Sequence, residues 1–296
     1  MRPTPPPPGR WSLGRVQANA AVSSGLLRLD VRLDGPAEFL PGQFAMLNLT
    51  GAETFVFGRP FSILEAVGET MSFLYRVVGQ GTRALAALAT GANLSVLGPL
   101  GTPFPPPDET TPSLLLAGGV GLPPLFAWWL RNGGDHDLAF FGGRDGGDVP
   151  WSLLPRSWQV SVDRGDHVPP GRDAFVGLVT ELARDRLAGD DTQRRILACG
   201  PRPLLAAAAA WAAERSWDCR VSVEERMGCG YGVCKGCVVP VRDPRQPVGW
   251  RNATCCQEGP VFAASHIDWQ RWRPAVPTGP DPGPSVGATA KRGGAR

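Results

Sequence analysis

The chain has 296 residues, which is enough for two compact domains and a small additional module. Its 30 basic residues barely outnumber its 27 acidic residues and are scattered, so we expect no nucleic-acid partner. Its apolar runs are too short to span a membrane, and its proline-rich N-terminus lacks the apolar segment of a secretory signal. We therefore expect a soluble, cytoplasmic protein without a membrane partner.

The first part of the chain has the pattern of a small antiparallel β-barrel. Residues 1–10 carry five prolines and are predicted to be a flexible tail. Residues 11–105 then show short runs of alternating polarity, such as Gly25–Leu33, and glycine or proline interrupts them at intervals of about ten residues. This rhythm is typical of a barrel.

A short motif in the barrel region, Arg59-Pro60-Phe61-Ser62, suits a flavin. Arg59 offers a fork of donors to a diphosphate, Phe61 an aromatic face and Ser62 a hydroxyl for a ring nitrogen. An ordinary barrel strand would explain the tetrapeptide alone. The signals that accompany it are Leu74-Tyr75-Arg76, Gly81-Thr82 and Gly98-Pro99-Leu100-Gly101. Gly81-Thr82 opens a predicted helix, whose free N–H groups can bind a phosphate, so we predict a flavin site here.

From residue 110 to residue 223 the pattern changes to strands that alternate with room for helices. The apolar strand candidates are residues 114–117, 138–141, 160–162, 196–198 and 220–223, and a helix candidate covers residues 125–130. Alternating strands and helices predict a doubly wound parallel sheet.

Two loops at the carboxyl ends of these strands predict a nicotinamide-dinucleotide site. The residues predicted to bind the dinucleotide are Gly118, Gly119, Gly121, Cys199, Gly200 and Pro201. The first loop lacks the third glycine of the G-x-G-x-x-G pattern, because Pro124 takes its place. A plain strand-to-helix turn and a core-packing Cys199 stay open as alternatives. Arg144 and Asp145 leave the preference between NAD and NADP open.

The strongest functional signal is the cysteine cluster in residues 224–270. Cys229, Cys234 and Cys237 have the spacing C-x4-C-x2-C, which is typical of a plant-type [2Fe-2S] cluster when a fourth cysteine follows. Cys255 and Cys256 both qualify as that fourth ligand. A structural zinc site is the alternative, but its cysteines usually come as two close pairs. Residues 271–296 are predicted to be a second flexible tail.

With these motifs the chain resembles the electron-transfer subunits of NAD-dependent dihydroorotate dehydrogenases, within the ferredoxin-reductase-like superfamily. The resemblance covers residues 11–269 and includes Cys256-Gln-Glu-Gly-Pro-Val-Phe. It implies an FAD-binding barrel, an NAD-binding α/β domain and a C-terminal [2Fe-2S] module. It also implies that Cys256 is the fourth ligand and that an FMN-containing catalytic subunit is the partner, with two copies of each chain.

The expected function is therefore an electron relay in pyrimidine biosynthesis, from the partner's FMN through the cluster and FAD to NAD+. Oxidising dihydroorotate needs a general base, and the three histidines, His136, His167 and His266, lie outside every motif, which places that chemistry on the partner. The rival interpretations are a subunit of a ferredoxin:NADP oxidoreductase or sulfhydrogenase, a non-catalytic redox sensor, and a zinc-stabilised binding module.

Overall fold

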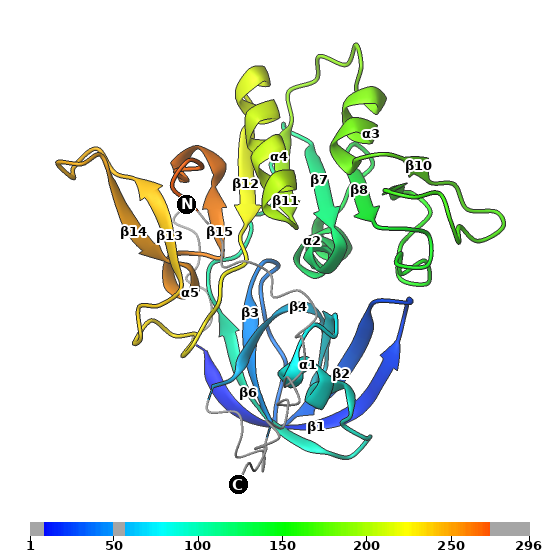
Figure 1. Cartoon of the computed structure of the whole chain (residues 1–296), viewed down its shortest axis with the longest axis vertical. Helices are drawn as coiled ribbons and strands as arrows, with labels where there is room; N and C mark the ends of the chain where they lie inside the picture. Colours follow the sequence, from blue (N-terminus) through cyan, green and yellow to red (C-terminus); the bar gives the residue numbers. More distant parts are fainter. Residues whose placement is uncertain (1–8, 50–56, 273–296) are drawn as a thin grey trace, which may run out of the picture.

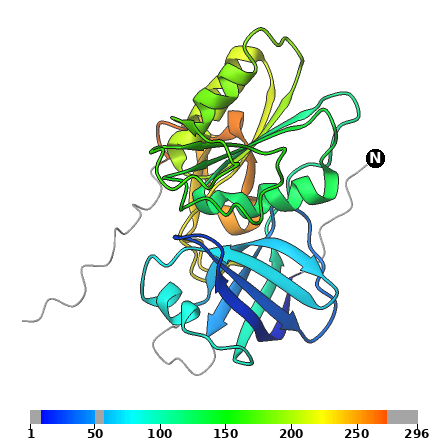
Figure 2. The same cartoon turned by 90° about the vertical axis from the view of Figure 1, so that its right-hand side faces the viewer.

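A computed structural model describes residues 9–49 and 57–272 of the chain. It shows a barrel, a parallel sheet above it, and a smaller part beside both, which we call the cysteine module (residues 224–272) (Figures 1 and 2). Most of the two predicted tails lies outside the described residues. Three residues assigned to those tails are structured, since Arg10 begins the first strand and Arg271 and Trp272 belong to the cysteine module.

Six antiparallel strands form the closed barrel in the order β1-β2-β5-β4-β3-β6, as the alternating pattern predicted. Every second side chain points inward, and Leu29, Val31 and Phe73 are completely buried there. The elements are β1 (Arg10–Ala21), β2 (Leu27–Leu33), β3 (Phe44–Leu49), β4 (Arg59–Val67), β5 (Thr70–Tyr75), α1 (Gln80–Ala86) and β6 (Asn93–Leu100).

The second part is a seven-stranded sheet in the order β10-β9-β8-β7-β11-β12-β15. Neighbouring strands are parallel except at β15, which runs antiparallel to β12. The strands are β7 (Ser113–Gly118), β8 (Leu138–Gly143), β9 (Gln159–Val162), β10 (Phe175–Val176), β11 (Arg195–Cys199), β12 (Asp218–Ser222) and β15 (Val261–Ala263). The prediction of a parallel sheet is confirmed, although the short strands β10 and β15 were not foreseen.

Helices cover both faces of this sheet. Leu114 and Leu116 of β7 face the core beneath α3 (Val179–Arg186) and α4 (Arg202–Arg215), whereas Leu115 faces α2. Helix α2 (Leu122–Asn132) follows the short helix η1 (Gly119–Gly121) and lies between the sheet and the barrel (Figures 1 and 2). None of the helices in the described ranges is long and apolar enough to cross a membrane.

The cysteine module is attached to both larger parts. It contains the hairpin β13 (Val238–Arg242) and β14 (Trp250–Thr254), the short helices α5 (Cys255–Glu258) and η2 (Ala264–His266), and strand β15. Strand β15 extends the sheet through β12. The backbone N–H of Thr102, just after the barrel, donates a hydrogen bond of 2.6 Å to the carbonyl of Gly259.

The barrel and the sheet share an apolar core. Leu26, Leu64 and Leu74 of the barrel pack with Leu122 and Phe126 of α2, and all five are buried. An apolar interface of this kind fixes two domains relative to each other, because separating them would expose their side chains to water.

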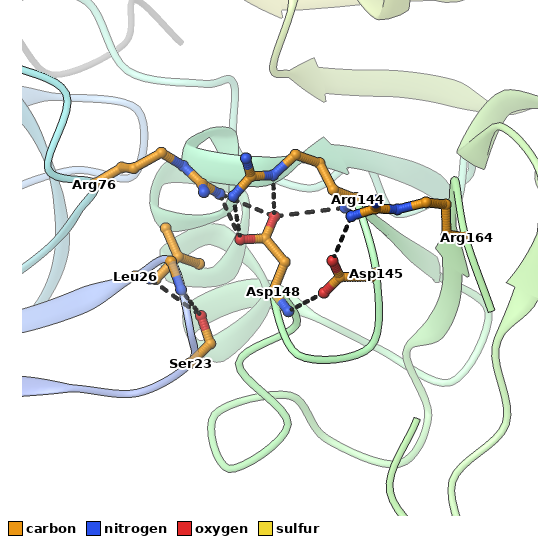
Figure 3. A network of polar contacts seen from close by, with 8 residues as sticks. Ser23, Leu26, Arg76, Arg144, Asp145, Asp148 and Arg164 are labelled. Carbon is orange, nitrogen blue, oxygen red and sulfur yellow. Dashed lines mark hydrogen bonds and ion pairs between the residues drawn. The ribbon is translucent and has the colours of Figure 1, made fainter. Parts of the chain in front are cut away.

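A buried carboxylate links the two parts at the rim of this core (Figure 3). Asp148, whose side chain is only 2% exposed, accepts hydrogen bonds of 2.9 Å at both oxygens from Arg76 of the barrel. Arg144, which follows β8, also donates to Asp148. A Cβ on Gly25 would lie 2.3 Å from Oδ1 of Asp148 and 2.4 Å from Nη1 of Arg76, so a larger residue there would displace this ion pair. Burial alone would raise the pKa of Asp148, but Arg144 and Arg76 outweigh it and hold the pKa below its ordinary value.

We expect Asp148→Asn to lower the free energy of unfolding by about 2 kcal/mol at neutral pH, because it removes a buried carboxylate that accepts charge-assisted hydrogen bonds from the partly buried Arg76 and the exposed Arg144. A carboxylate with a lowered pKa stabilises the fold above its unfolded pKa, and that contribution is lost as pH falls through the folded value. The difference between the variant and the wild type should therefore shrink below about pH 4. Urea unfolding at a series of pH values measures it.

The matched control is Glu69→Gln, which removes the exposed ion pair with Arg32. It should cost less than about 1 kcal/mol. Equal losses in the two variants would contradict a special role for Asp148.

Candidate functional site

The predicted flavin residues come together at one end of the barrel. Arg59 begins β4, and its guanidinium lies against Gly81 in the first turn of α1, where a Cβ would clash with it. Burial lowers the pKa of Arg59. The predicted phosphate donor and the predicted phosphate-binding helix start are thus neighbours, although they are about twenty residues apart in sequence. An anionic group placed here would meet a guanidinium as well as backbone N–H groups.

Several of the other predicted flavin residues have structural partners within the barrel. Phe61 meets Tyr75 edge to face at 5.9 Å, and the Tyr75 hydroxyl donates to Asn19 at 2.8 Å. Leu74 is buried in the core shared with α2. The Thr82 hydroxyl accepts hydrogen bonds from the backbone at the start of α1. Pro60 and Ser62 are half-buried on β4, and flavin contacts of all these residues stay predictions.

The two predicted dinucleotide loops also meet. Strands β7 and β11 are parallel neighbours, with Ala117 opposite Cys199, so their carboxyl ends lie at the same edge. A Cβ on Gly121 would clash with the backbone of Cys199 and Gly200. Beside them, Gly118 approaches Pro201, and Gly119 begins the 3-10 turn. This close packing leaves backbone groups rather than side chains at the edge where such sheets bind nucleotides.

Two polar residues missed in the sequence lie next to Cys199. Burial raises the pKa of Cys199 to about 12, and its thiol is hydrogen-bonded to Ser222 at the end of β12. The charge of Glu224 contributes to the same rise, and burial raises the pKa of Glu224 itself. The signal available in the sequence was their position at the carboxyl end of the last predicted strand.

The cysteines form two close pairs. The backbone N–H of Cys234 lies 3.4 Å from the sulfur of Cys229, and that of Cys256 lies 3.4 Å from the sulfur of Cys237. Burial is the main cause that raises the pKa of Cys256 to about 12, and the neighbouring Cys237 and Cys229 add to it. Because Cys229 acts on Cys256, the two pairs lie close to each other. Burial alone would raise the pKa of Cys229, but backbone N–H groups of Cys234 and Tyr231 lower it to about 6.

Cys255 is separated from this group by its orientation. Its sulfur points to the carbonyl of Val223 at the end of the sheet, and its backbone N–H donates to the carbonyl of Cys237. It is completely buried, and burial raises its pKa well above the ordinary thiol value. Cys256, one residue on, faces the sulfur of Cys237 instead. The geometry supports Cys256 over Cys255 as the fourth ligand.

Residues 228–237, which we call the cysteine loop, fold back onto helix α5. A Cβ on Gly232, whose φ is +88°, would clash with the side chain of Gln257. Gln257 in turn donates to the carbonyl of Tyr231 and accepts from Lys235. The loop thus holds its three cysteines next to the helix that carries the fourth.

Within the described part of the chain, no group of three or more His, Cys, Asp or Glu side chains surrounds a single metal position. A [2Fe-2S] cluster has two irons and takes four cysteine thiolates, so its ligands are shared between two centres. The four thiols, shared between the loop and helix α5, fit that requirement. The three histidines, His136, His167 and His266, are exposed, as expected for residues outside the motifs.

Comparison with known proteins agrees with this arrangement. A family described as the iron-sulfur cluster binding domain of dihydroorotate dehydrogenase B matches residues 224–268. The chain is 32% identical over 262 residues to the "Dihydroorotate dehydrogenase B (NAD(+)), electron transfer subunit" of Bacillus velezensis, covering 85% of this chain and 96% of the relative. The subunit of the same name from Caldanaerobacter subterraneus is 30% identical, with 87% and 99% covered.

Solved structures share the fold. A chain of the NADH-dependent reduced ferredoxin-NADP oxidoreductase superimposes with a TM-score of 0.71 at 23% identity, covering 91% of this chain and 92% of that one. The ferredoxin reductase of carbazole 1,9a-dioxygenase gives a TM-score of 0.62 at 23% identity, with 71% and 67% covered.

The lowered pKa predicts selective reactivity of Cys229 in protein freed of iron by a chelator. The thiolate is the nucleophile, so alkylation of Cys229 by iodoacetamide should rise with pH around a midpoint near 6. Alkylation of Cys256 should need far higher pH, because its pKa is about 12. Mass spectrometry of peptides after brief labelling measures both. A Cys229 midpoint near the ordinary thiol value of 9 would contradict the predicted hydrogen bonding.

Serine substitutions separate the two candidate fourth ligands. Cys256→Ser should lose most of the bound iron or alter the EPR spectrum, because a proposed ligand is removed. Cys255→Ser, its matched neighbour, should keep iron content and spectrum, since its sulfur faces Val223. The reverse pattern would assign the ligand to Cys255.

Proposed function

The chain belongs to the family of dihydroorotate dehydrogenase B electron transfer subunits, and we propose that it relays electrons between NAD(H) and a catalytic partner through FAD and a [2Fe-2S] cluster. The resemblance inferred from the motifs is thereby confirmed. The observation that supports the relay most directly is the pairing of the four cysteines at the place where the cysteine module meets both the barrel and the sheet.

The chemistry of the three groups fits a relay. Nicotinamide exchanges a hydride, flavin accepts two electrons and releases them singly, and an iron-sulfur cluster carries one. The residues of this chain bind and orient the cofactors. Arg59 and the start of α1 bind the diphosphate of FAD, and the glycine turns after β7 and β11 bind the dinucleotide. The four thiols bind the cluster. Cys199, whose pKa is raised to about 12, is a neutral thiol beside the proposed nicotinamide position.

The partner that we propose is an FMN-containing dihydroorotate dehydrogenase subunit, with two copies of each chain in the complex. The relatives are named as electron transfer subunits, which supports a separate catalytic chain. The histidines support it as well, because all three are exposed and lie outside the predicted cofactor motifs, so this chain offers no evident histidine base. We propose a cytoplasmic location because all seven cysteines are free, as suits a reducing compartment.

Co-purification tests the proposal. A tagged chain purified under anaerobic conditions should carry flavin and iron and should retain an FMN-containing partner. Dihydroorotate should reduce NAD+ in the presence of that partner and not with the isolated chain. The isolated chain should still oxidise NADH with an artificial acceptor such as ferricyanide.

Three outcomes would contradict this function in different ways. Oxidation of dihydroorotate by the isolated chain would place the substrate site here. A colourless protein containing zinc would favour a structural module. Slow reduction of the flavin by NADH would favour a redox sensor over a relay.

A further inference from the structure

Strand β3 separates two packed regions of the molecule. Ala45 and Leu47 point into the interior of the barrel. Met46, which points to the opposite side, lies in the apolar core that also contains Cys237 and Cys256 of the cysteine module. One strand therefore forms part of the barrel wall on one face and part of the module's support on the other.

Met46 contacts the cysteine loop at Gly230, the residue after Cys229. A Cβ on Gly230 would lie 2.5 Å from Cγ and 2.6 Å from Sδ of Met46, which is closer than side chains approach. Gly230 also has a φ of +80°, which glycine adopts readily. Met46 is only 1% exposed, and Gly230 is buried. The thioether is thus packed directly against the backbone of the loop.

The same residue adjoins the predicted flavin motif through its backbone. In the antiparallel pairing of β3 with β4, Met46 lies opposite Pro60 and Ala45 lies opposite Phe61. Residues opposite each other in such a pair are about 5 Å apart. A single residue of β3 therefore connects the strand of the flavin motif with the cysteine loop.

We propose that Met46 is the positioning residue that sets the separation between the flavin-binding strands and the cysteine loop, and so controls electron passage between them. This inference rests on the proposed relay function. Methionine suits the role because its unbranched, polarisable side chain fills irregular gaps without strain. Glycine at position 230 lets the loop approach to contact distance, and the thioether leaves no void between them.

The step concerned is a single electron transfer. Bound FAD would accept a hydride from NADH, that is two electrons and a proton, and would pass one electron to the oxidised cluster, while the second stays on the flavin until an acceptor reoxidises the cluster. No covalent bond to the protein forms or breaks, and the flavin proton is released to water. Electron transfer of this kind depends steeply on the distance between the centres, so a displaced loop slows it.

The test is a graded series of substitutions in the whole flavin- and iron-loaded chain. Met46→Leu keeps most of the volume, whereas Met46→Val and Met46→Ala shorten the side chain progressively. Rapid mixing with NADH follows flavin bleaching, and freeze-quenched EPR follows cluster reduction. We expect flavin bleaching at the wild-type rate throughout. Cluster reduction should slow by on the order of tenfold in Met46→Ala, less in Met46→Val and least in Met46→Leu, as expected when reacting groups are misplaced.

The matched control is Met71→Ala, because Met71 is also buried in the barrel but packs in its own interior, away from the module. It should lose comparable thermal stability and keep the wild-type rate of cluster reduction. Equal slowing in Met71→Ala and Met46→Ala would overturn the proposal, since a general loosening of the barrel would then suffice. If Met46→Ala does not bind flavin, the rates of cluster reduction in Met46→Val and Met46→Leu are compared with that in Met71→Ala instead.

Hydrogen–deuterium exchange gives a readout independent of turnover. Residues 228–237 should exchange faster in Met46→Ala than in the wild type and in Met71→Ala, with iron content unchanged. Unchanged exchange together with unchanged cluster reduction in all variants would overturn this inference alone. A wild-type protein in which NADH bleaches the flavin but never reduces the cluster would overturn the proposed relay, and this inference with it.

Discussion

A single apolar core holds the barrel and the parallel sheet together, and the position of every proposed cofactor site depends on it. Leu26 and Leu74 of the barrel pack with Leu122 and Phe126 of α2. Packed interiors are nearly incompressible, so the ends of the two parts keep a fixed separation. Asp148 also fixes the orientation of the sheet relative to the barrel at the rim of this core, because Arg76 comes from the barrel and Arg144 follows β8. Hydride transfer between two bound cofactors requires such fixed geometry.

The fold was largely predictable because each long element carries its own burial pattern. The alternation in residues 25–33 reappears as β2, and the apolar runs at 114–117 and 196–198 reappear as the central strands β7 and β11. The strands that escaped prediction are short or lie in the cysteine module. Strand β15 has three residues, and its place in the sheet depends on a partner about forty residues earlier, which no local pattern indicates.

The sequence predicts those residues of the site that belong to a recognisable motif. The glycine turns after β7 and β11 were identified separately, and the structure brings them together because their strands are neighbours. Asp148 and Met46 gave no comparable signal. An aspartate in a glycine-rich loop looks like a turn residue, and a methionine in an apolar strand looks like core. Their partners, Arg76 and Gly230, are distant in sequence, so only the tertiary structure reveals these contacts.

Strand β15 also determines how this chain can be divided. It comes from the cysteine module, yet it forms the edge of the nucleotide-binding sheet beside β12. Without the residues after 223, the backbone N–H and C=O groups along one side of β12 would lose their partners, and open edges of this kind pair with other chains. The module that carries the redox cysteines is therefore also the cover that protects the sheet from aggregation. A chain shortened to residue 223 would present β12 as an open edge strand and would be expected to associate with other chains more readily than the full chain.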